Sequence, residues 1–208
     1  MASTKKDETR QRLLDVARML FLARGFHGVS LEDIAEAAGV SRQAIYKSHF
    51  SSKADLVLAL ARHVHVVEKL DELIQPALAA TDAVEKLEAS IRAVIQIHGK
   101  LHDLSIVLST AARTDPGAAA AWAERMHAQR AGLRVAVQLL SDEGLLDPRW
   151  GIDEVVDMLS SFLSVDTYQM LVVERGWTPE LLVTRLCTIS RETFLVTPSG
   201  KPNRKTLG

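Results

Sequence analysis

The sequence contains a single cysteine, Cys187, among its 208 residues, so no disulfide can form within one chain. It also has no apolar run near the roughly 20 residues that a membrane-spanning helix needs. Its first residues, MASTKKDETRQRLL, lack the apolar stretch of a signal peptide. We therefore expect a cytoplasmic protein without a disulfide framework, in which Cys187 acts as a small buried hydrophobic residue.

Motifs that carry catalysis are missing as well. The sequence has no glycine-rich phosphate loop, no nucleophile elbow and no CxxC pair. Among its histidines, His63 and His65 face different directions on a helix, and Gly99 predicts a helix boundary between His98 and His102. We therefore expect no enzyme activity, no metal site and no cofactor.

An excess of positive charge is absent too, since 25 Lys and Arg stand against 26 Asp and Glu. The distribution is slightly uneven, because residues 1–55 hold nine Lys or Arg against seven Asp or Glu. This asymmetry permits contact with DNA at the N-terminal end without requiring it, because the local placement of cations matters more than their total.

Helical patterns are what the sequence does contain. Apolar residues recur at three- and four-residue steps, and no segment alternates as a strand would. Turn residues such as Pro76, Gly144 and Gly176 separate the patterns, and Thr178-Pro179 is typical of a helix start. The prediction is an all-α fold of about nine helices, over residues 7–23, 31–38, 42–47, 53–74, 83–98, 104–114, 116–143, 153–174 and 178–195. The tail over residues 197–208 is expected to be disordered.

Residues 31–50, LEDIAEAAGVSRQAIYKSHF, have the features of two short helices joined by a tight turn. Ser30 and Ser41 are N-cap candidates, and Ala35 and Gly39 supply small residues where the two backbones cross. The apolar residues that would hold the second helix against the first are Ile34, Ala38, Val40 and Ile45. Such a unit presents the start of its second helix to the major groove. An ordinary helical corner without a ligand is the alternative.

The residues around this unit carry a resemblance. The matching positions are Leu13-Leu14, Ala17, Leu20-Phe21, Gly25-Phe26, Ser30-Leu31, Ile34-Ala35, Ala38-Gly39-Val40-Ser41, Ile45-Tyr46, His49-Phe50, Ser52-Lys53 and Leu56. With these residues the segment 9–56 resembles the DNA-binding domain of the TetR family of bacterial regulators. The resemblance implies an all-helical homodimer with a DNA-binding domain over residues 1–55, and an effector-binding and dimerisation domain over residues 56–196.

The resemblance also implies roles for individual residues. At the start of the recognition helix, Arg42, Gln43 and Ala44 would read bases, by pairing with guanine, pairing with adenine and touching a thymine methyl. Other polar residues would bind phosphates. They are Ser30, Ser41, Tyr46, Lys47, His49 and Lys53, the last beside the helix N-terminus at Ser52.

One departure from the family pattern is visible after Tyr46. The pattern usually has two residues between this tyrosine and the phenylalanine matched by Phe50, whereas here there are three. One inserted residue rotates all that follow by about 100° on a regular helix. The sequence therefore predicts that the recognition helix bulges or unwinds between Tyr46 and His49, so that Phe50 keeps its place in the core.

The C-terminal part offers candidates for two further sites. A dimer interface is predicted on the last two helices, at Leu159, Leu163, Met170, Leu182, Leu186 and Ile189. A mainly apolar effector pocket is predicted among the helices that start near residues 83, 116 and 153, lined by Trp122, Met126, Phe162, Asp166 and Tyr168. If buried, Asp166 needs a partner, and it could recognise a cationic or hydroxylated effector, pair with an arginine across the dimer, or face water.

Three functions are compatible with these patterns. The leading hypothesis is a repressor that binds a palindromic operator as a homodimer and is released by a small-molecule effector. The alternative is a DNA-binding regulator whose C-terminal domain is only a protein–protein module. An all-α enzyme or adaptor is the third, and the dense N-terminal match argues against it. A pocket of a few hundred Å³ would favour the first over the second.

Overall fold

The computed structural model describes residues 5–196, apart from the side chains of Lys47 and Ser48. Within that range it contains ten α-helices and two π-helical segments, and its only β-type pairing is an isolated bridge between Leu146 and Leu195. The all-α prediction is confirmed. The tail predicted to be disordered, residues 197–208, lies outside the described residues.

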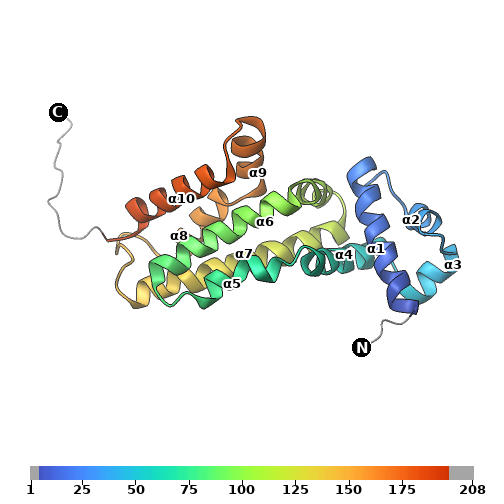
Figure 1. Ribbon diagram of the computed structural model, residues 1–208, viewed down its shortest axis with the longest axis horizontal. Helices are drawn as coiled ribbons and strands as arrows, with labels where there is room; N and C mark the ends of the chain where they lie inside the picture. The colour runs from blue at the N-terminus through green and yellow to red at the C-terminus, as the bar shows by residue number, and fades with distance from the viewer. Residues whose placement is uncertain (1–4, 197–208) are drawn as a thin grey trace.

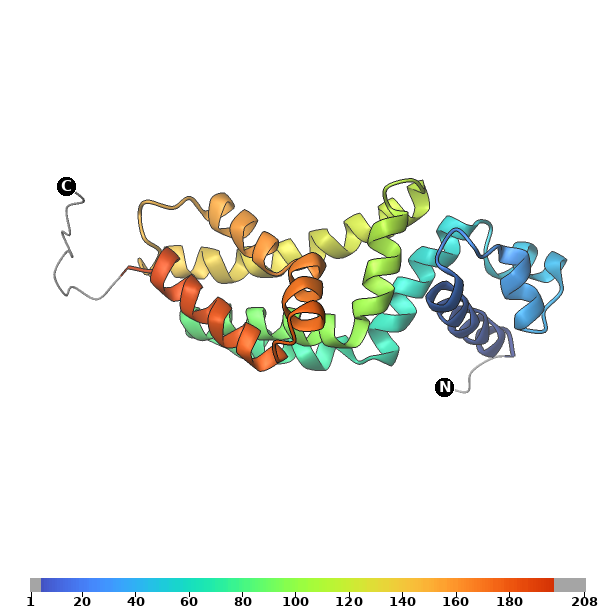
Figure 2. The ribbon, with the colours of Figure 1, turned by 90° about the horizontal axis from the view of Figure 1, so that it is seen from above.

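The helices form an elongated molecule with two parts (Figure 1 and Figure 2). One end, here called the head, consists of α1 (Lys5–Arg24), α2 (Leu31–Ala37), α3 (Arg42–Ala44) and the π-helical η1 (Ile45–His49). α4 (Lys53–Val67) leads from the head into the body. The body consists of α5 (Leu70–Ala79), α6 (Ala83–Ala111), α7 (Pro116–Asp142), α8 (Ile152–Phe162), α9 (Val165–Tyr168), the π-helical η2 (Gln169–Glu174) and α10 (Pro179–Phe194).

Serine caps start α2, α3 and α4, as predicted. Ser30 forms a capping box with Asp33, in which Ser30 Oγ accepts from the Asp33 amide at 3.1 Å and Asp33 Oδ2 accepts from the Ser30 amide at 2.7 Å. Ser41 Oγ accepts from the Ala44 amide at 3.2 Å, and Ser52 Oγ accepts from the Asp55 amide at 3.1 Å. Each bond satisfies an amide that the helix itself leaves free.

The helix predicted over residues 53–74 is two helices in the structure. α4 ends at Val67, and α5 begins after Lys69, whose φ of 53° lies in the left-handed region. That conformation is unfavourable for a residue with a Cβ, so contacts from elsewhere must hold it. Arg18 of α1 pairs with the Glu68 carboxylate at 2.8 Å, and Lys100 of α6 donates to the Glu68 carbonyl at 2.7 Å.

Pro76 does not mark the break that was predicted there, because it lies inside α5. A proline within a helix removes one backbone hydrogen bond and crowds the preceding turn. The helix continues for three more residues, to Ala79, and Lys86 of α6 donates to the free carbonyl of Ala77 at 2.7 Å. Packing against α6 therefore outweighs the local preference of the proline.

The two helices predicted over residues 83–98 and 104–114 are one continuous helix, α6. Gly99, which was expected to end the first, lies inside it. A Cβ at this position would lie 3.4 Å from Tyr168 Oη, so the glycine sits where the α9 segment packs closely on α6. The glycine accommodates a neighbour that is 69 positions further along the chain.

The helix predicted over residues 153–174 is interrupted. α8 ends at Phe162, and Ser164 caps α9 by accepting from the Thr167 amide at 3.1 Å. The backbone then continues as the π-helical η2. The predicted helix over residues 116–143 and the last one, capped by Thr178 with Pro179 at its start, agree with α7 and α10 within one or two residues.

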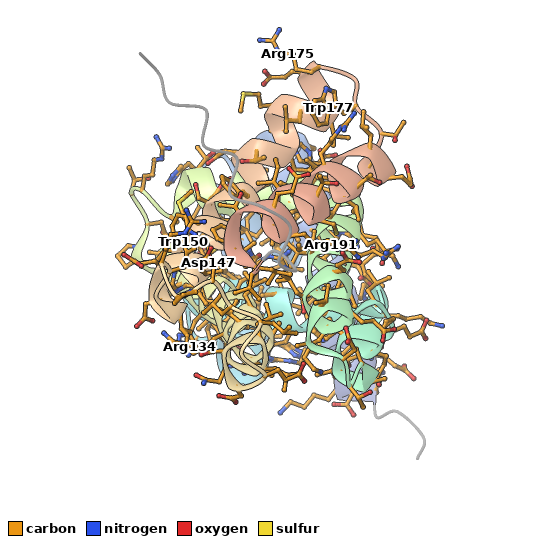
Figure 3. The ribbon with its side chains drawn as sticks, turned by 90° about the vertical axis from the view of Figure 1, so that its left-hand side faces the viewer. Arg134, Asp147, Trp150, Arg175, Trp177 and Arg191 are labelled. Atoms are coloured by element: carbon orange, nitrogen blue, oxygen red, sulfur yellow. The ribbon has the colours of Figure 1, made fainter. Side chains whose placement is uncertain are left out.

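Two apolar cores hold the molecule together. The first joins the head to the inner face of α4 and to the adjoining ends of α6 and α7, and the second lies within the body. Trp150 lies at the far end of the body (Figure 3). Its Nε1 donates to the Thr193 carbonyl at 2.9 Å, and its ring meets that of Phe194 edge-on. α4 begins at Lys53 and packs in the head's core beyond residue 55. The domain division after residue 55 stays a prediction.

None of the helices among residues 5–196 combines the length and apolar character required to cross a lipid bilayer.

Candidate DNA-reading helix and ligand pocket

The start of α3 is presented at the tip of the head, at the end of the molecule remote from α8 and α10 (Figure 1). Ser41 caps it, while Arg42 and Gln43 are exposed and Ala44 is half-buried. The first turn of a helix also has free amides and a positive partial charge. The arrangement gives the three predicted base-reading residues an open approach to a groove edge.

The end of this helix is irregular, as the extra residue predicts. η1 is a π-turn over Ile45–His49, in which the Phe50 amide bonds to the Ile45 carbonyl at 2.8 Å, five residues back. A π-turn accommodates one residue more than an α-turn. Ile45 and Phe50 are both buried in the head's core, so the insertion is absorbed between them. The prediction for this segment is confirmed.

Arg10 of α1 fixes the end of the π-turn. Its Nη1 donates to the His49 carbonyl at 2.7 Å, and its guanidinium lies 4.4 Å from the centre of the Phe50 ring. The predicted phosphate contact His49 is half-buried, its Nδ1 has no partner, and burial lowers its pKa. The side chain of the other candidate here, Lys47, lies outside the described residues.

Glu32 of α2 holds two of the predicted DNA contacts, and sequence reasoning missed it. Its carboxylate pairs with Arg42 at 3.0 Å and accepts from Tyr46 Oη at 3.1 Å. A backbone hydrogen bond at the helix start and the bond from Tyr46 lower the pKa of Glu32. The Arg42 side chain is 76% exposed, so the pair contributes little stability. Its effect is to orient Arg42 and Tyr46.

Lys53 and Ser30, both predicted to bind phosphate, also hold the head together. Lys53 Nζ donates to the Phe26 carbonyl at 2.6 Å and lies 3.9 Å from the centre of the Phe26 ring. Partial burial lowers its pKa. The Ser30 hydroxyl is engaged in the capping box, whereas Ser41 is exposed. Phosphate contact by these residues stays a prediction.

A cavity of about 530 Å³ lies between α4, α5, α6 and α7. Its walls are mainly apolar, and of the five predicted lining residues the structure places Trp122 there. The helix expected from residue 153 does not contribute to it, and the other four candidates lie elsewhere. Met126 is half-buried outside the wall, Phe162 packs on the second core, Asp166 is exposed, and Tyr168 is buried against α6.

His98 and His102 share one face of α6, contrary to the predicted helix boundary, and both rings stack near Tyr168, at 5.7 and 5.6 Å between centres. His98 Nε2 lies 2.9 Å from the Leu163 carbonyl, and burial lowers the pKa of His98 to about 4. His63 and His65 instead pair with Asp15 and Asp71. Among the described residues, no group of three or more His, Cys, Asp or Glu is placed to hold a metal ion.

The predicted dimer residues divide into two groups. Leu159 and Leu163, at α8, and Leu182 and Leu186, on α10, are buried in the chain's own second core. Met170 and Ile189 are exposed, at 48% and 41%. The remaining exposed large apolar residues of α8, η2 and α10 are Met158, Val173 and Leu181. We call these five exposed residues the outer face. The dimer interface stays a prediction.

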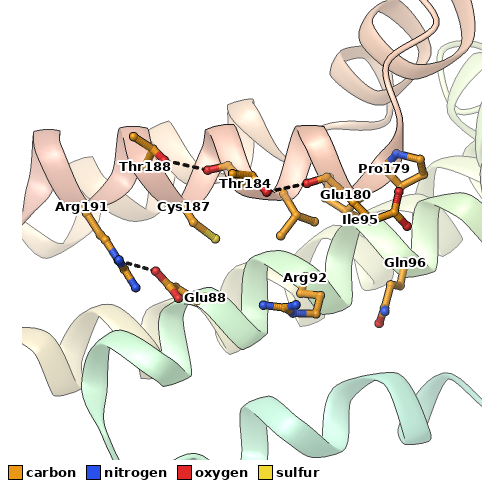
Figure 4. Close-up of a pocket in the computed structure, with 11 residues that line it drawn as sticks. Glu88, Arg92, Ile95, Gln96, Pro179, Glu180, Thr184, Cys187, Thr188 and Arg191 are labelled. Atoms are coloured by element: carbon orange, nitrogen blue, oxygen red, sulfur yellow. Dashed lines mark hydrogen bonds and ion pairs between the residues drawn. The ribbon is translucent and has the colours of Figure 1, made fainter.

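A second, more polar cavity of about 350 Å³ lies between α6 and α10 (Figure 4). Its groups are largely engaged with one another, since Arg191 pairs with Glu88, and Thr184 and Thr188 donate to carbonyls one turn back in α10. Burial raises the pKa of Cys187 to about 11, so its thiol stays protonated. With its thiol protonated, Cys187 offers no nucleophile to this cavity.

Comparison with known proteins places this geometry in context. Residues 13–60 match the sequence profile of the bacterial regulatory proteins of the tetR family. The chain is 30% identical over 161 residues to the transcriptional repressor AcnR of Corynebacterium efficiens, an alignment that covers 76% of this chain and 78% of that protein. It is 38% identical over 88 residues to the transcriptional activator FasR of Mycolicibacterium smegmatis, covering 42% of this chain and 39% of FasR.

The FasR alignment spans less than half of that relative. Among solved structures, a transcriptional regulator of Saccharomonospora viridis in complex with choline superposes with a TM-score of 0.72 at 21% identity, covering 91% of this chain and 99% of that one. At this identity the likeness concerns the fold alone.

Proposed function

The chain belongs to the TetR family of DNA-binding transcriptional regulators, and from this premise we propose that it binds a two-fold symmetric operator as a homodimer and is released by a small molecule. The relatives include a named repressor and a named activator. We propose repression, with release from DNA as the response to the effector.

The exposed first turn of α3 carries this proposal. Arg42 and Gln43 project from a capped helix start whose far end is anchored in the core by Ile45 and Phe50. An arginine pairs bidentately with guanine and a glutamine with adenine in the major groove. On binding, a guanine edge would compete with Glu32 for Arg42, and a phosphate would compete with Glu32 for Tyr46. The pair with Glu32 is exposed and therefore weak, so the exchange costs little.

The outer face of the body supports a homodimer. It offers Met158, Met170, Val173, Leu181 and Ile189, large apolar side chains of α8, η2 and α10 that a partner chain would cover. A two-fold axis through this face would pair α8 and α10 with their copies and leave both heads free. Two-fold symmetry in the protein then imposes near-palindromic symmetry on the operator.

The cavity in the body supports an effector, because it is concave, mainly apolar and within the usual size range of ligand sites. This observation favours a ligand-responsive regulator over one whose C-terminal part is only a protein–protein module. An all-α enzyme or adaptor receives no support, since the matched relatives are transcriptional regulators.

α4 provides the route between the cavity and DNA. One side of it, with Leu56, Val57 and Leu60, belongs to the head's core, and a later part, with Val64 and His65, lines the cavity. A ligand that prefers one position of α4 would therefore shift the head. The shift requires that the ligand bind more tightly to one position of α4 than to the other. A coupling free energy of about 1–3 kcal/mol between the ligand and DNA changes operator affinity about 5- to 150-fold.

The test is selection of bound genomic fragments followed by affinity measurement on the recovered site. Arg42→Ala should cost about 1–3 kcal/mol on that site and relax the choice of base at one position in each half-site. Arg175→Ala is the matched control, because Arg175 is an exposed arginine on the body (Figure 3). Equal effects of both variants, or absence of salt-dependent DNA binding by the wild type, would contradict the proposal.

A further inference from the structure

The cavity between α4 and α7 contains a half-buried charged side chain that no carboxylate of the described residues neutralises. Arg125 of α7 lies on the stripe that faces α6, between Trp122 and Gln129, and it lines the cavity. Its Nε is shielded from solvent and has no hydrogen-bond partner. Within residues 5–196, Arg125 makes no ion pair with any carboxylate.

The other charged groups of the cavity wall are already engaged. Glu124 is the single acidic residue of the wall, and it is exposed and pairs with Arg62 at 3.6 Å. His65 pairs with Asp71, and Lys86 donates to the Ala77 carbonyl. Arg125 and Lys86 therefore have no carboxylate partner among the described residues, and of the two Arg125 also has a buried donor without an acceptor.

An unpaired charge in an apolar setting is costly, because the interior solvates it poorly. Burial lowers the pKa of Arg125, although an arginine remains protonated at any physiological pH. A guanidinium offers a planar set of donors that fits a carboxylate through two parallel hydrogen bonds. An anionic ligand head would supply both the missing charge and the missing acceptors.

The rest of the cavity is suited to an apolar body. Leucine, isoleucine, valine and alanine side chains from α5 and α6 form its walls, and Trp122 adds an aromatic face one turn before Arg125. A ligand that satisfied Arg125 with a charged group at one end would bury a hydrocarbon portion against these walls. A ligand with a negatively charged end is opposite in charge to the cationic effector that was considered for Asp166. Asp166 itself is exposed and lies outside the cavity wall.

We propose that this cavity binds an amphipathic monocarboxylate, with the carboxylate paired to Arg125 and an aliphatic chain against the apolar walls. The inference rests on the proposed function for its regulatory meaning, since the carboxylate would be the effector. The binding site itself requires only the cavity and Arg125.

Calorimetric titration of the full chain with three twelve-carbon probes tests the site. Dodecanoate should bind, and dodecanol and dodecyltrimethylammonium should bind on the order of 10- to 100-fold more weakly, as expected for loss of a hydrogen-bonded ion pair. Arg125→Met should weaken dodecanoate by a similar factor and leave dodecanol within about threefold. Arg125→Lys, which keeps the charge and loses the fork, should fall between.

Arg62→Met is the matched control, since Arg62 lines the same cavity but is paired and exposed. It should change dodecanoate binding by less than about threefold. Equal binding of dodecanoate and dodecanol by the wild type would overturn the proposal, and this comparison needs no variant to fold. So would absence of dodecanoate binding, or an equal loss in Arg62→Met and Arg125→Met.

Operator affinity measured with and without dodecanoate separates this inference from the proposed function. Dodecanoate that binds through Arg125 but leaves DNA affinity unchanged supports the site and contradicts release by this ligand. If the protein binds no DNA, the proposed function is contradicted. The comparison of the three probes still tests whether the cavity binds a carboxylate through Arg125.

Discussion

Gly117 is where the body meets the start of α4, and replacing it with alanine should force the two apart. A Cβ on Gly117 would lie 2.4 Å from Ala54 Cβ and 2.5 Å from Ala54 Cα. Carbon atoms pack at about 3.5–4.0 Å, so the helices would have to separate by roughly 1 Å. The atoms in the way are the Cα and Cβ of Ala54, and neither can be moved by rotating a side chain.

The magnitude follows from two opposed effects. Overpacking of this kind costs about 1–3 kcal/mol, and alanine recovers up to about 1 kcal/mol of helix propensity relative to glycine. The net loss of about 1–2 kcal/mol should lower the Tm by roughly 2–8 °C in a chain of this size. Thermal unfolding followed by circular dichroism at one fixed protein concentration measures it.

Gly132→Ala supplies the matched comparison, because it makes the same change in the same helix where a Cβ meets nothing within 4 Å. It should raise stability by about 0.5–1 kcal/mol. Ala54→Gly should rescue Gly117→Ala only in part, since the Ala54 Cα remains in the way. If Gly117→Ala melts at or above the wild type, the close crossing of α4 and α7 does not constrain the molecule, and the reasoning fails.

Three further outcomes are expected. Deleting Ser48 should convert the π-turn to a regular helix end and leave Phe50 buried and the fold intact by circular dichroism; an unfolded variant would show that the π-turn is required. Ile189→Asp should weaken self-association on the order of 10- to 100-fold in sedimentation, whereas Met19→Asp in the head should not; a persistent dimer in Ile189→Asp would move the interface elsewhere. Burial lowers the pKa of His98 from 6.5 to about 4, so the folded protein keeps this histidine neutral down to that pH. The free energy of unfolding that depends on neutral His98 is fully present above pH 6.5 and is lost as the pH falls towards 4. The free energy of unfolding should fall by about 3 kcal/mol across this range. His98→Gln should flatten the plot of unfolding free energy against pH between 6.5 and 4, and an unchanged plot would show that other groups cause the loss.

The chemistry of helix ends was readable from the sequence because it is local. Ser30, Ser41, Ser52 and Thr178 each bond to an amide three residues ahead, so the cap and its partner appear together in any short window. The irregular end of the recognition helix was equally local. One residue too many before Phe50 requires a wider turn, and the π-turn supplies it.

The faces of the last helices were readable only in part. The spacing of Leu182, Leu186 and Ile189 indicates an amphipathic helix, but one helix can direct such a stripe to its own chain or to a partner. In the structure the two leucines pack on the body and Ile189 points outward. The same ambiguity misplaced Phe162 and Tyr168, which pack in the second core instead of lining the cavity.

What the sequence determined by itself is the local chemistry of the head, namely its helix caps and the wider turn before Phe50, each set by residues a few positions apart. Contacts over longer separations complete the head, such as those of Arg10 with the His49 carbonyl and Lys53 with the Phe26 carbonyl. What only the tertiary structure decided depends on partners far along the chain. Gly99 lies inside α6 at a point that Tyr168 approaches, and Glu68, just after α4, is held by Arg18 and Lys100. The absence of a carboxylate partner for Arg125 among the described residues likewise depends on the tertiary structure, because the packing of four helices determines which side chains can reach it. Local periodicity determines that a segment is helical, but the free energy of packing distant surfaces determines where it breaks and what it encloses.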